Sequence, residues 1–385
     1  MTQPPTWGAP PPQQPGGWPG QPAPGQPVPG QPGPGGQWGP QQPWPAPVPP
    51  KKSGAAKWAI GAVSLVAVIA LTATVAVSCT KNSGDSNGGG GGGTKTSAAQ
   101  SDVASANDNG PVGIITEDPS CAPWTPITNT LAGVESNGWL KRDPSIPLGA
   151  WTPEARGQYE AVGKAMRKAA DQAVPLSKMT THRVMREMYG QFIAYSRAYA
   201  DSLMTYTAVD DNLASAASTA SLVITYVCGA VISGAAEARA SLVPAPAPPP
   251  TVAPVGNLSN PQRIFDTPDT VCSELSPTLQ QLLQNPVFKS WVNGDPSVPA
   301  ANLPPDQQAL ADAVAPLMTS TADALETLAK KTSNPVVRDF IELGVQYRRT
   351  FVQALATYQA NDQDVYLAGQ YAPGVVSMAC RYAAS

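Results

Sequence analysis

The sequence feature that most limits the fold is a phrase that occurs twice. Trp139–Pro147 reads WLKRDPSIP, and 152 residues later Trp291–Pro299 reads WVNGDPSVP. With this offset and no gap, 27 of the 90 positions from Trp139 to Cys228 are identical to their counterparts. Identity at a fixed spacing over so long a stretch indicates an internal duplication. The chain is therefore expected to contain two copies of one structural unit.

Both copies carry the apolar spacing of amphipathic helices. The first copy places apolar side chains at alternating steps of four and three: Val162, Met166, Ala169, Ala173 and Leu176. The second copy repeats these steps with Val314, Met318, Thr321, Leu325 and Leu328. Such steps put one stripe on one face of a helix, which another helix must cover. Proline directly after Thr152 and after Asn334 is typical of the first turn of a helix.

These patterns predict an all-α domain made of two tandem duplicated units of about four helices each, residues 119–240 and 271–385. Residues 241–270 contain the run PAPAPPPTVAP and are expected to form a semi-rigid spacer. Residues 212–236 carry no charge, so they are either a second membrane span or a buried helix. Their many Ser and Thr residues favour the buried helix.

The N-terminal part predicts a tail and an anchor. Residues 1–57 are rich in Pro, Gly and Gln, which predicts a disordered tail of polyproline II character. Residues 58–78 carry no charge, and a helix of that length measures about 31 Å, enough to span a bilayer. Lys51, Lys52 and Lys57 precede this segment, so the positive-inside rule predicts a cytoplasmic tail and an extracytoplasmic remainder.

The same segment has a second interpretation, a signal peptide that ends at a lipidated Cys79. Its apolar run and the region before it are too long for a signal peptide, so we favour a retained single-pass anchor in the plasma membrane. Residues 79–118 include a run of glycines, which predicts a flexible Gly/Ser-rich linker.

The four cysteines after Cys79 fall two in each copy. Four cysteines permit three pairings. The duplication favours the pairing in which each unit closes on itself, Cys121 with Cys228 and Cys272 with Cys380. Disulfides persist outside the cytoplasm, which agrees with the predicted topology.

Motifs for enzyme chemistry do not occur in the sequence. The one histidine, His182, faces Asn334 in the other copy and is interpreted as a surface residue at a helix start. No Gly-rich phosphate loop, spaced set of metal ligands or G-x-S-x-G motif occurs, so no catalytic residue, cofactor or metal is expected. The formal charge of −3 provides no basic field for nucleic acid.

Two arginines recur in both copies and form the candidate binding face: Arg186, Arg197, Arg338 and Arg349. Eleven residues are close to three helical turns, so each pair shares a face opposite the apolar stripe. The face is a candidate site for an anionic lipid or polymer. The alternative is that the arginines pair with acids such as Asp171 and Asp323.

The repeated Asp-Pro-Ser phrase has two interpretations as well. One is a ligand-facing loop. The other, which we favour, is a structural turn between helices, in which Asp and Ser side chains bind nearby backbone amides. Trp139 and Trp291 are then expected to anchor the turn to the core.

The order of features resembles the proline-rich single-pass envelope proteins of actinobacteria, especially mycobacteria. The resemblance rests on a Pro/Gly/Gln/Trp tail, lysines before one span, a Gly/Ser tether and an Ala-rich ectodomain with cysteines. It covers the first 120 residues and implies an accessory role in wall assembly, division or envelope-lipid export.

We therefore expect a non-enzymatic, membrane-anchored envelope adaptor or binding module, with envelope proteins or lipids as partners. The alternative is a carrier or sensor that holds an envelope lipid or glycan between the two units. A dry cleft lined by the repeated tyrosines would indicate the carrier, and a closed core would indicate the adaptor.

Overall fold

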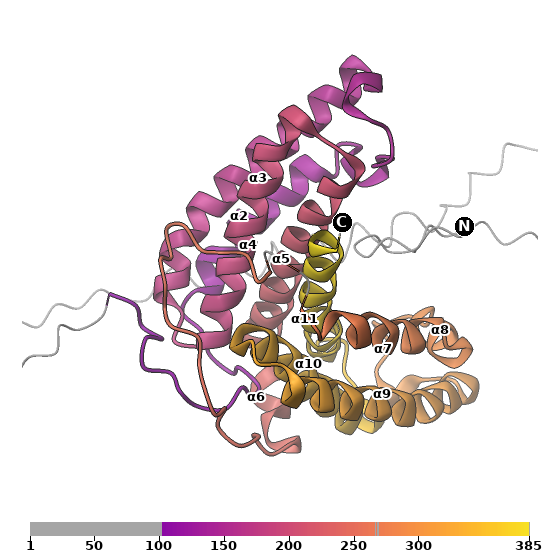
Figure 1. Ribbon diagram of the computed structural model, residues 1–385. Coiled ribbons are helices and arrows are strands. Elements are labelled where there is room, and N and C mark those ends of the chain that lie inside the picture. Colours follow the sequence, from indigo (N-terminus) through magenta and orange to yellow (C-terminus); the bar gives the residue numbers. More distant parts are fainter. Residues whose placement is uncertain (1–101, 266, 268, 385) are drawn as a thin grey trace, which may run out of the picture. The chain divides into compact units, whose positions relative to one another are not determined.

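The computed structural model describes residues 102–265, 267 and 269–384, which form α-helices joined by loops and short 3-10 helices (Figure 1). The first half holds α2 (Cys121–Glu135), α3 (Pro153–Met179), α4 (Arg183–Ser202), α5 (Asp211–Ile232) and α6 (Ala235–Arg239). The second holds α7 (Cys272–Gln284), α8 (Pro286–Val292), α9 (Pro305–Lys331), α10 (Pro335–Ala354) and α11 (Asp362–Ala383). No strand occurs among these residues, which confirms the all-α class.

Helices α3 and α10 begin where the prolines predict. Thr152 caps α3 by accepting a hydrogen bond from the backbone N–H of Ala155, and Pro153 is the first helical residue. Asn334 caps α10 in the same way, accepting from two backbone N–H groups. These caps satisfy amides that have no partner inside the helix. Helices α3 and α9 each have 27 residues and begin 152 residues apart.

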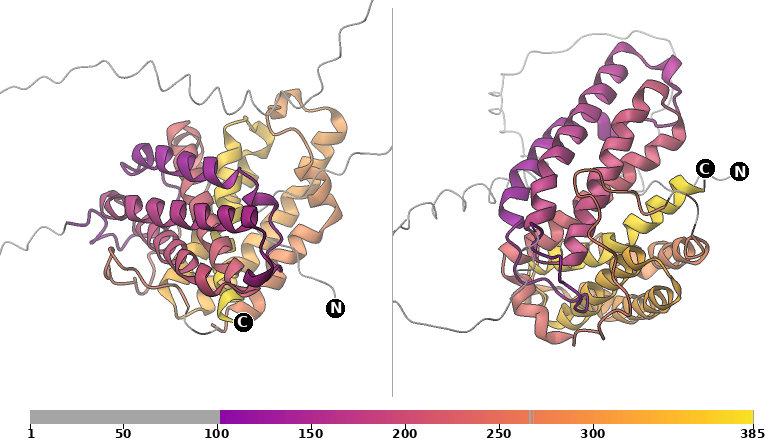
Figure 2. Two further views of the ribbon diagram at one scale, coloured as in Figure 1. Left: turned by 90° about the horizontal axis from the view of Figure 1, so that it is seen from above. Right: turned by 60° about the vertical axis from the view of Figure 1, so that its left-hand side comes forward.

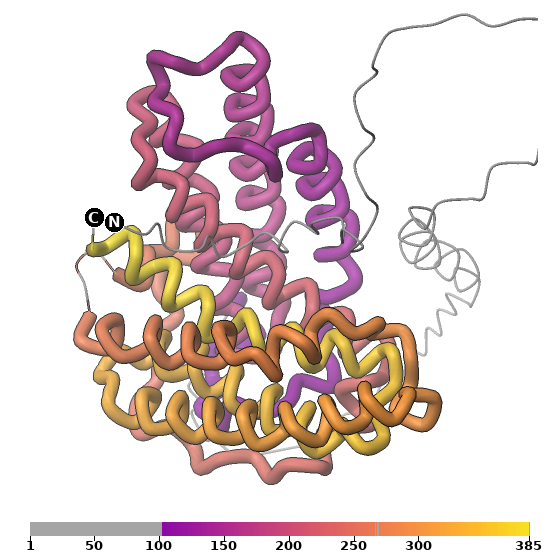
Figure 3. Tube along the Cα trace, turned by 90° about the vertical axis from the view of Figure 1, so that its right-hand side faces the viewer, coloured from indigo at the N-terminus to yellow at the C-terminus, as the bar shows by residue number. Residues whose placement is uncertain are grey.

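The predicted apolar stripes form the core of each half. Met166 and Ala173 of α3 are fully buried and face α4, while Met318 and Leu325 of α9 are fully buried and face α10. Figure 3 shows α7 and α9 side by side, with the helices of the first half above them. The two halves belong to one compact unit, in which α5 packs along α11.

Helix α5 contains the uncharged segment of the sequence. Within the described part of the chain, one helical stretch, Ala208–Ile232, is long and apolar enough to cross a membrane. Its side chains at Ala216, Ala220 and Val223 are fully buried, and the helix lies between α4 and α11 (Figure 1). This packing is that of the expected buried helix. The predicted span at 58–78 and the tail before it lie outside the described residues.

Two disulfides close the halves as the sequence predicts. Cys121 at the start of α2 is bonded to Cys228 in α5, and Cys272 at the start of α7 is bonded to Cys380 in α11. Each bond therefore joins the first helix of its half to the last long one.

Residues 102–118 differ from the flexible linker that the sequence predicts. Val112 and Ile115 are 3% and 2% exposed and belong to the core. The backbone N–H of Ile115 donates to the hydroxyl of Tyr347, in the other half. In the sequence, Val112 and Ile115 follow many Gly, Ser, Asn and Asp residues, and that composition is typical of a flexible linker. The linker prediction is wrong for this part, which is a structural arm of the domain.

The spacer at 241–270 is also held against the helices. It runs across α4 (Figure 2), where Arg197 donates to the carbonyl of Ser259 and Gln191 donates to that of Gln262. Phe265, near its end, is buried. The spacer therefore covers the surface of α4 instead of standing free between the halves.

Candidate functional site

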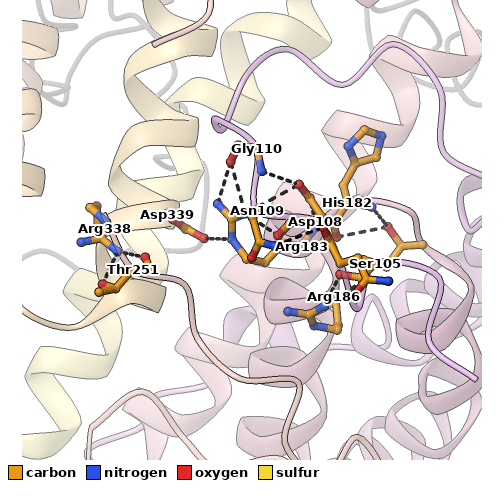
Figure 4. Close-up of polar contacts among 12 residues, drawn as sticks. Ser105, Asp108, Asn109, Gly110, His182, Arg183, Arg186, Thr251, Arg338 and Asp339 are labelled. Carbon is orange, nitrogen blue, oxygen red and sulfur yellow. Dashed lines mark hydrogen bonds and ion pairs between the residues drawn. The ribbon is translucent and has the colours of Figure 1, made fainter. Parts of the chain in front are cut away.

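A buried ion pair joins the two halves where α4 meets α10 (Figure 4). The Nε of Arg183 donates to Oδ2 of Asp339 at 2.6 Å, and the two side chains are 1% and 0% exposed. Nη1 of Arg183 also donates to the carbonyl of Asp108 at 2.7 Å and to that of Gly110 at 3.2 Å. The guanidinium thus binds the N-terminal arm and both halves at once.

A second carboxyl lies beside this pair. Glu187 of α4 is the counterpart of Asp339 at the 152-residue offset, and it is buried. Burial, and after it the charge of Asp339, raises the pKa of Glu187 well above its usual value, although Arg183 and Arg186 oppose the shift. The equivalent acids of the two halves therefore face each other, and the Glu187 carboxyl is stabilised in its protonated form.

Two of the four predicted arginines are buried. Arg186 and Arg338 are 3% and 6% exposed. Arg186 donates to the backbone carbonyl of Ser105 in the N-terminal arm, and Arg338 donates to that of Thr251 in the spacer (Figure 4). The expectation of an exposed arginine face is wrong for both, because the arm and the spacer cover the outer side of α4 and α10.

The other two arginines form the ion pairs that the sequence offered as the alternative. Arg197 pairs with Asp171 at 2.6 Å, and Arg349 pairs with Asp323 at the same distance. Arg349 also binds Glu326 at 2.7 Å. Each pair joins neighbouring long helices of one half. The four arginines are therefore held by partners within the domain and do not form one open surface.

The repeated Asp-Pro-Ser phrase is a turn with the same bonds in both halves. The carboxylate of Asp143 accepts from the N–H and the hydroxyl of Ser145, and Asp295 accepts from Ser297 in the same way. The hydroxyl of Tyr206 donates to the carbonyl of Pro144. Tyr358 donates to the carbonyl of Pro296. These bonds confirm the structural interpretation of the phrase.

The other residues singled out by the sequence have structural contacts as well. Trp139 is 3% exposed, and its indole N–H donates to the hydroxyl of Tyr199, while Trp291 is partly buried. His182 immediately precedes α4 and its Nε2 lies 2.9 Å from the carbonyl oxygen of Glu117. In the described part of the chain, no group of three or more His, Cys, Asp or Glu side chains is placed to hold a metal ion.

Sequence reasoning missed a cluster of exposed apolar side chains on the loops of the first half. We call it the apolar tip: Leu140, Ile146, Met204 and Val209, exposed by 55%, 40%, 84% and 37%. The two loops that carry it lie together, because Tyr206 bonds to Pro144 and packs its ring 5.0 Å from that of Trp151.

The second half keeps only part of this surface, since Val292, the counterpart of Leu140, is 43% exposed. The counterparts of Met204 and Val209 at the 152-residue offset are Ala356 and Asn361. A position-by-position comparison of the two copies would have shown this difference in the sequence. The larger exposed apolar surface of the first half marks that end of the domain as a candidate protein contact.

Comparison with known proteins places the domain among mycobacterial sequences. The family model described as Mycobacterial ESX-1 associated protein matches residues 103–384. An uncharacterized protein of Mycolicibacterium smegmatis (strain MKD8) is 43% identical over 345 residues, which cover 90% of this chain and 91% of that protein. No solved structure matches the chain.

Proposed function

Because the chain belongs to the family of mycobacterial ESX-1 associated proteins, we propose that it is a non-enzymatic adaptor associated with the ESX-1 secretion system. In this proposal residues 58–78 anchor the chain in the plasma membrane, with the tail in the cytoplasm and the helical domain outside it. The domain arose by duplication of one helical unit and binds a protein of the envelope through its apolar tip.

Two observations support the location. Both cysteine pairs of the domain form disulfides, which persist in oxidising compartments and are rare in the cytoplasm. Lysines precede the apolar segment at 58–78, as they do on the cytoplasmic side of membrane spans.

The observation that carries the adaptor role is the apolar tip. Met204 is 84% exposed, on a loop fixed to its neighbour by the bond between Tyr206 and Pro144. Exposed apolar side chains on a preorganised surface lose little conformational freedom when a partner covers them. The equivalent positions of Met204 and Val209 in the second half hold Ala356 and Asn361, so the tip is larger in the first half.

The closed core favours the adaptor over the carrier. A lipid carrier needs a cleft lined by the repeated tyrosines. Tyr195, Tyr199 and Tyr347 are instead fully buried, and aromatic side chains packed in this way contribute to core stability.

The test is photocrosslinking in cells from a residue beside the tip, with capture of the bound partner. Met204→Asp places a charge at the centre of the contact and is expected to reduce the captured partner at least about tenfold, a loss of about 1.4 kcal/mol. Ala356→Asp, at the exposed equivalent position of the second half, is the control and is expected to change nothing. Equal capture by both variants and the unmodified protein would exclude the tip as the docking surface.

A further inference from the structure

A cavity of about 290 Å³ lies in the first half, at the base of the apolar tip. Its wall is formed largely by apolar side chains, which come from α2, α3, α4, α5 and the loop after α2: Leu131, Trp139, Leu140, Met166, Phe192 and Leu222. Ligand pockets in proteins range from roughly 300 to 1,000 Å³. The volume of this cavity is close to the lower end of that range, so it suits a small molecule and not a lipid chain.

Two of the residues that line this cavity carry a buried polar atom without a partner among the described residues. Glu135, the last residue of α2, lines it, and its Oε1 is buried and bonds to no atom of the described residues. The hydroxyl of Ser218 in α5 is buried and unpartnered in the same sense. Burial raises the pKa of Glu135 to about 7, although the charge of Arg142 opposes the shift. A buried acceptor without a hydrogen bond costs about 1–3 kcal/mol, so a ligand that donates to it gains affinity.

Among the described residues, Arg142 is the one cation that lines the cavity, and it is already paired. Arg142 donates through Nε and Nη2 to Oδ1 of Asp211, and through Nη1 to the carbonyl of Trp139. Its guanidinium lies 3.4 Å from the centre of the Trp139 ring. With Asp211 and Arg142 paired, ionised Glu135 leaves the cavity with a net charge of −1. That charge favours a cationic ligand over an anionic one.

The second half does not keep the ion pair, and it keeps only part of the polar helix face, since Gln370 stands in place of Ser218. At the 152-residue offset Gly294 stands in place of Arg142, Gln363 in place of Asp211 and Leu367 in place of Ser215. Trp291, the counterpart of Trp139, packs instead against the ring of Tyr366 at 5.0 Å. The equivalent region of the second half therefore holds the buried Arg348 bonded to Gln370, while the first half retains a cavity lined by an ion pair and a glutamate.

We propose that this cavity binds a small primary amine that carries a hydrocarbon group. The ammonium donates to the Glu135 carboxylate, and the hydrocarbon packs against Leu131 and Trp139. Because the ammonium stabilises ionised Glu135, binding near neutral pH releases a proton from the fraction of molecules in which that carboxyl is protonated. The site does not depend on the adaptor role.

The test is titration calorimetry of the full chain in nanodiscs with three probes of one shape, namely benzylamine, benzyl alcohol and benzoate. Benzylamine is expected to bind at least about tenfold more tightly than the other two. The heat at pH 7 is expected to change with the ionisation enthalpy of the buffer, because a proton is released. Equal binding of benzyl alcohol, tighter binding of benzoate, or no benzylamine binding at millimolar concentration would each overturn the proposal.

Variants separate the site from the fold. Glu135→Gln is expected to abolish the preference for the amine, and Glu237→Gln, an exposed glutamate of α6, is the control that should retain it. Ser215→Leu introduces the residue of the second half and is expected to block all three probes while the helical content stays unchanged. Amine binding that survives both cavity variants would place the ligand elsewhere. Since neither variant alters Met204, a failure here leaves the crosslinking result at the tip unaffected.

Discussion

Arg183 and Asp339 form a 2.6 Å ion pair between α4 and α10, and solvent reaches about 1% or less of either side chain. Desolvation of two charges makes such a pair a weak source of net stability, but removal of one partner leaves the other charge buried and unpaired. The pair therefore makes the contact between the halves sensitive to either residue.

Asp339→Asn is expected to lower the free energy of unfolding by up to about 3–5 kcal/mol, because it leaves the buried Arg183 with only the more distant carboxylate of Asp108, at 3.6 Å. Asp323→Asn is the matched control, since its partner Arg349 is partly exposed, and exposed pairs contribute about 0–1 kcal/mol. Urea unfolding followed by circular dichroism measures both. A loss at Asp339 no larger than that at Asp323 would show that the buried pair does not hold the halves together.

Glu135→Gln is expected to stabilise the protein at pH 8 but not at pH 4.5. The pKa of Glu135 is raised from 4.5 to about 7 in the folded protein. The folded state therefore binds more protons than the unfolded state between these values, and stability falls as the pH rises through that window. The full difference is on the order of 3 kcal/mol, and Gln removes it because it does not ionise. Urea midpoints at the two pH values provide the test, and a constant difference between the proteins would contradict it.

Cleavage of either disulfide is expected to destabilise the whole domain. The bonds span 107 and 108 residues, for which the loss of chain entropy predicts about 4–5 kcal/mol each. Because α5 and α11 pack along each other, the double variants Cys121→Ser/Cys228→Ser and Cys272→Ser/Cys380→Ser should each lower the melting temperature of one common transition. Two separate transitions in the melting curve would mean that the halves unfold independently.

The proposed topology predicts that the C-terminus is accessible from outside the cell. In a variant that combines Cys79→Ser with Ser385→Cys, a membrane-impermeant thiol reagent should label intact cells. A cysteine introduced in the tail at Ser53 is the control and should react only after lysis. Protection of Ser385→Cys until lysis would reverse the proposed orientation.

The helices and the disulfides could be predicted because local and repeated patterns determine them. The four-three steps through Met166 and Met318 require a covered helix face, and caps such as Thr152 mark where helices begin. The register of the two copies selected one disulfide pairing out of three, and both bonds are present.

The burial of the arginines could not be predicted from such patterns. Helical periodicity places Arg186 opposite the apolar stripe, which on an isolated helix pair means exposure to water. In the structure the carbonyl of Ser105 accepts its hydrogen bond there. Periodicity cannot report that an arm poor in apolar residues folds back over a helix, because the arm has no pattern of its own. The cavity beside Glu135 could not be predicted for a related reason: it results from residues that differ between the halves, and the duplication is visible only in residues that are identical.

The two disulfides also decide how the domain would respond to tension. A pull between residues 102 and 384 crosses from Cys121 to Cys228, follows residues 229–271, and crosses again from Cys272 to Cys380. Helices α3, α4, α9 and α10 lie inside the closed loops and carry none of the load. Once the helices no longer pack together, the segment between Cys228 and Cys272 can reach a length of no more than roughly 150 Å. The crosslinks thus make the domain a short link of fixed reach, even after its helices separate.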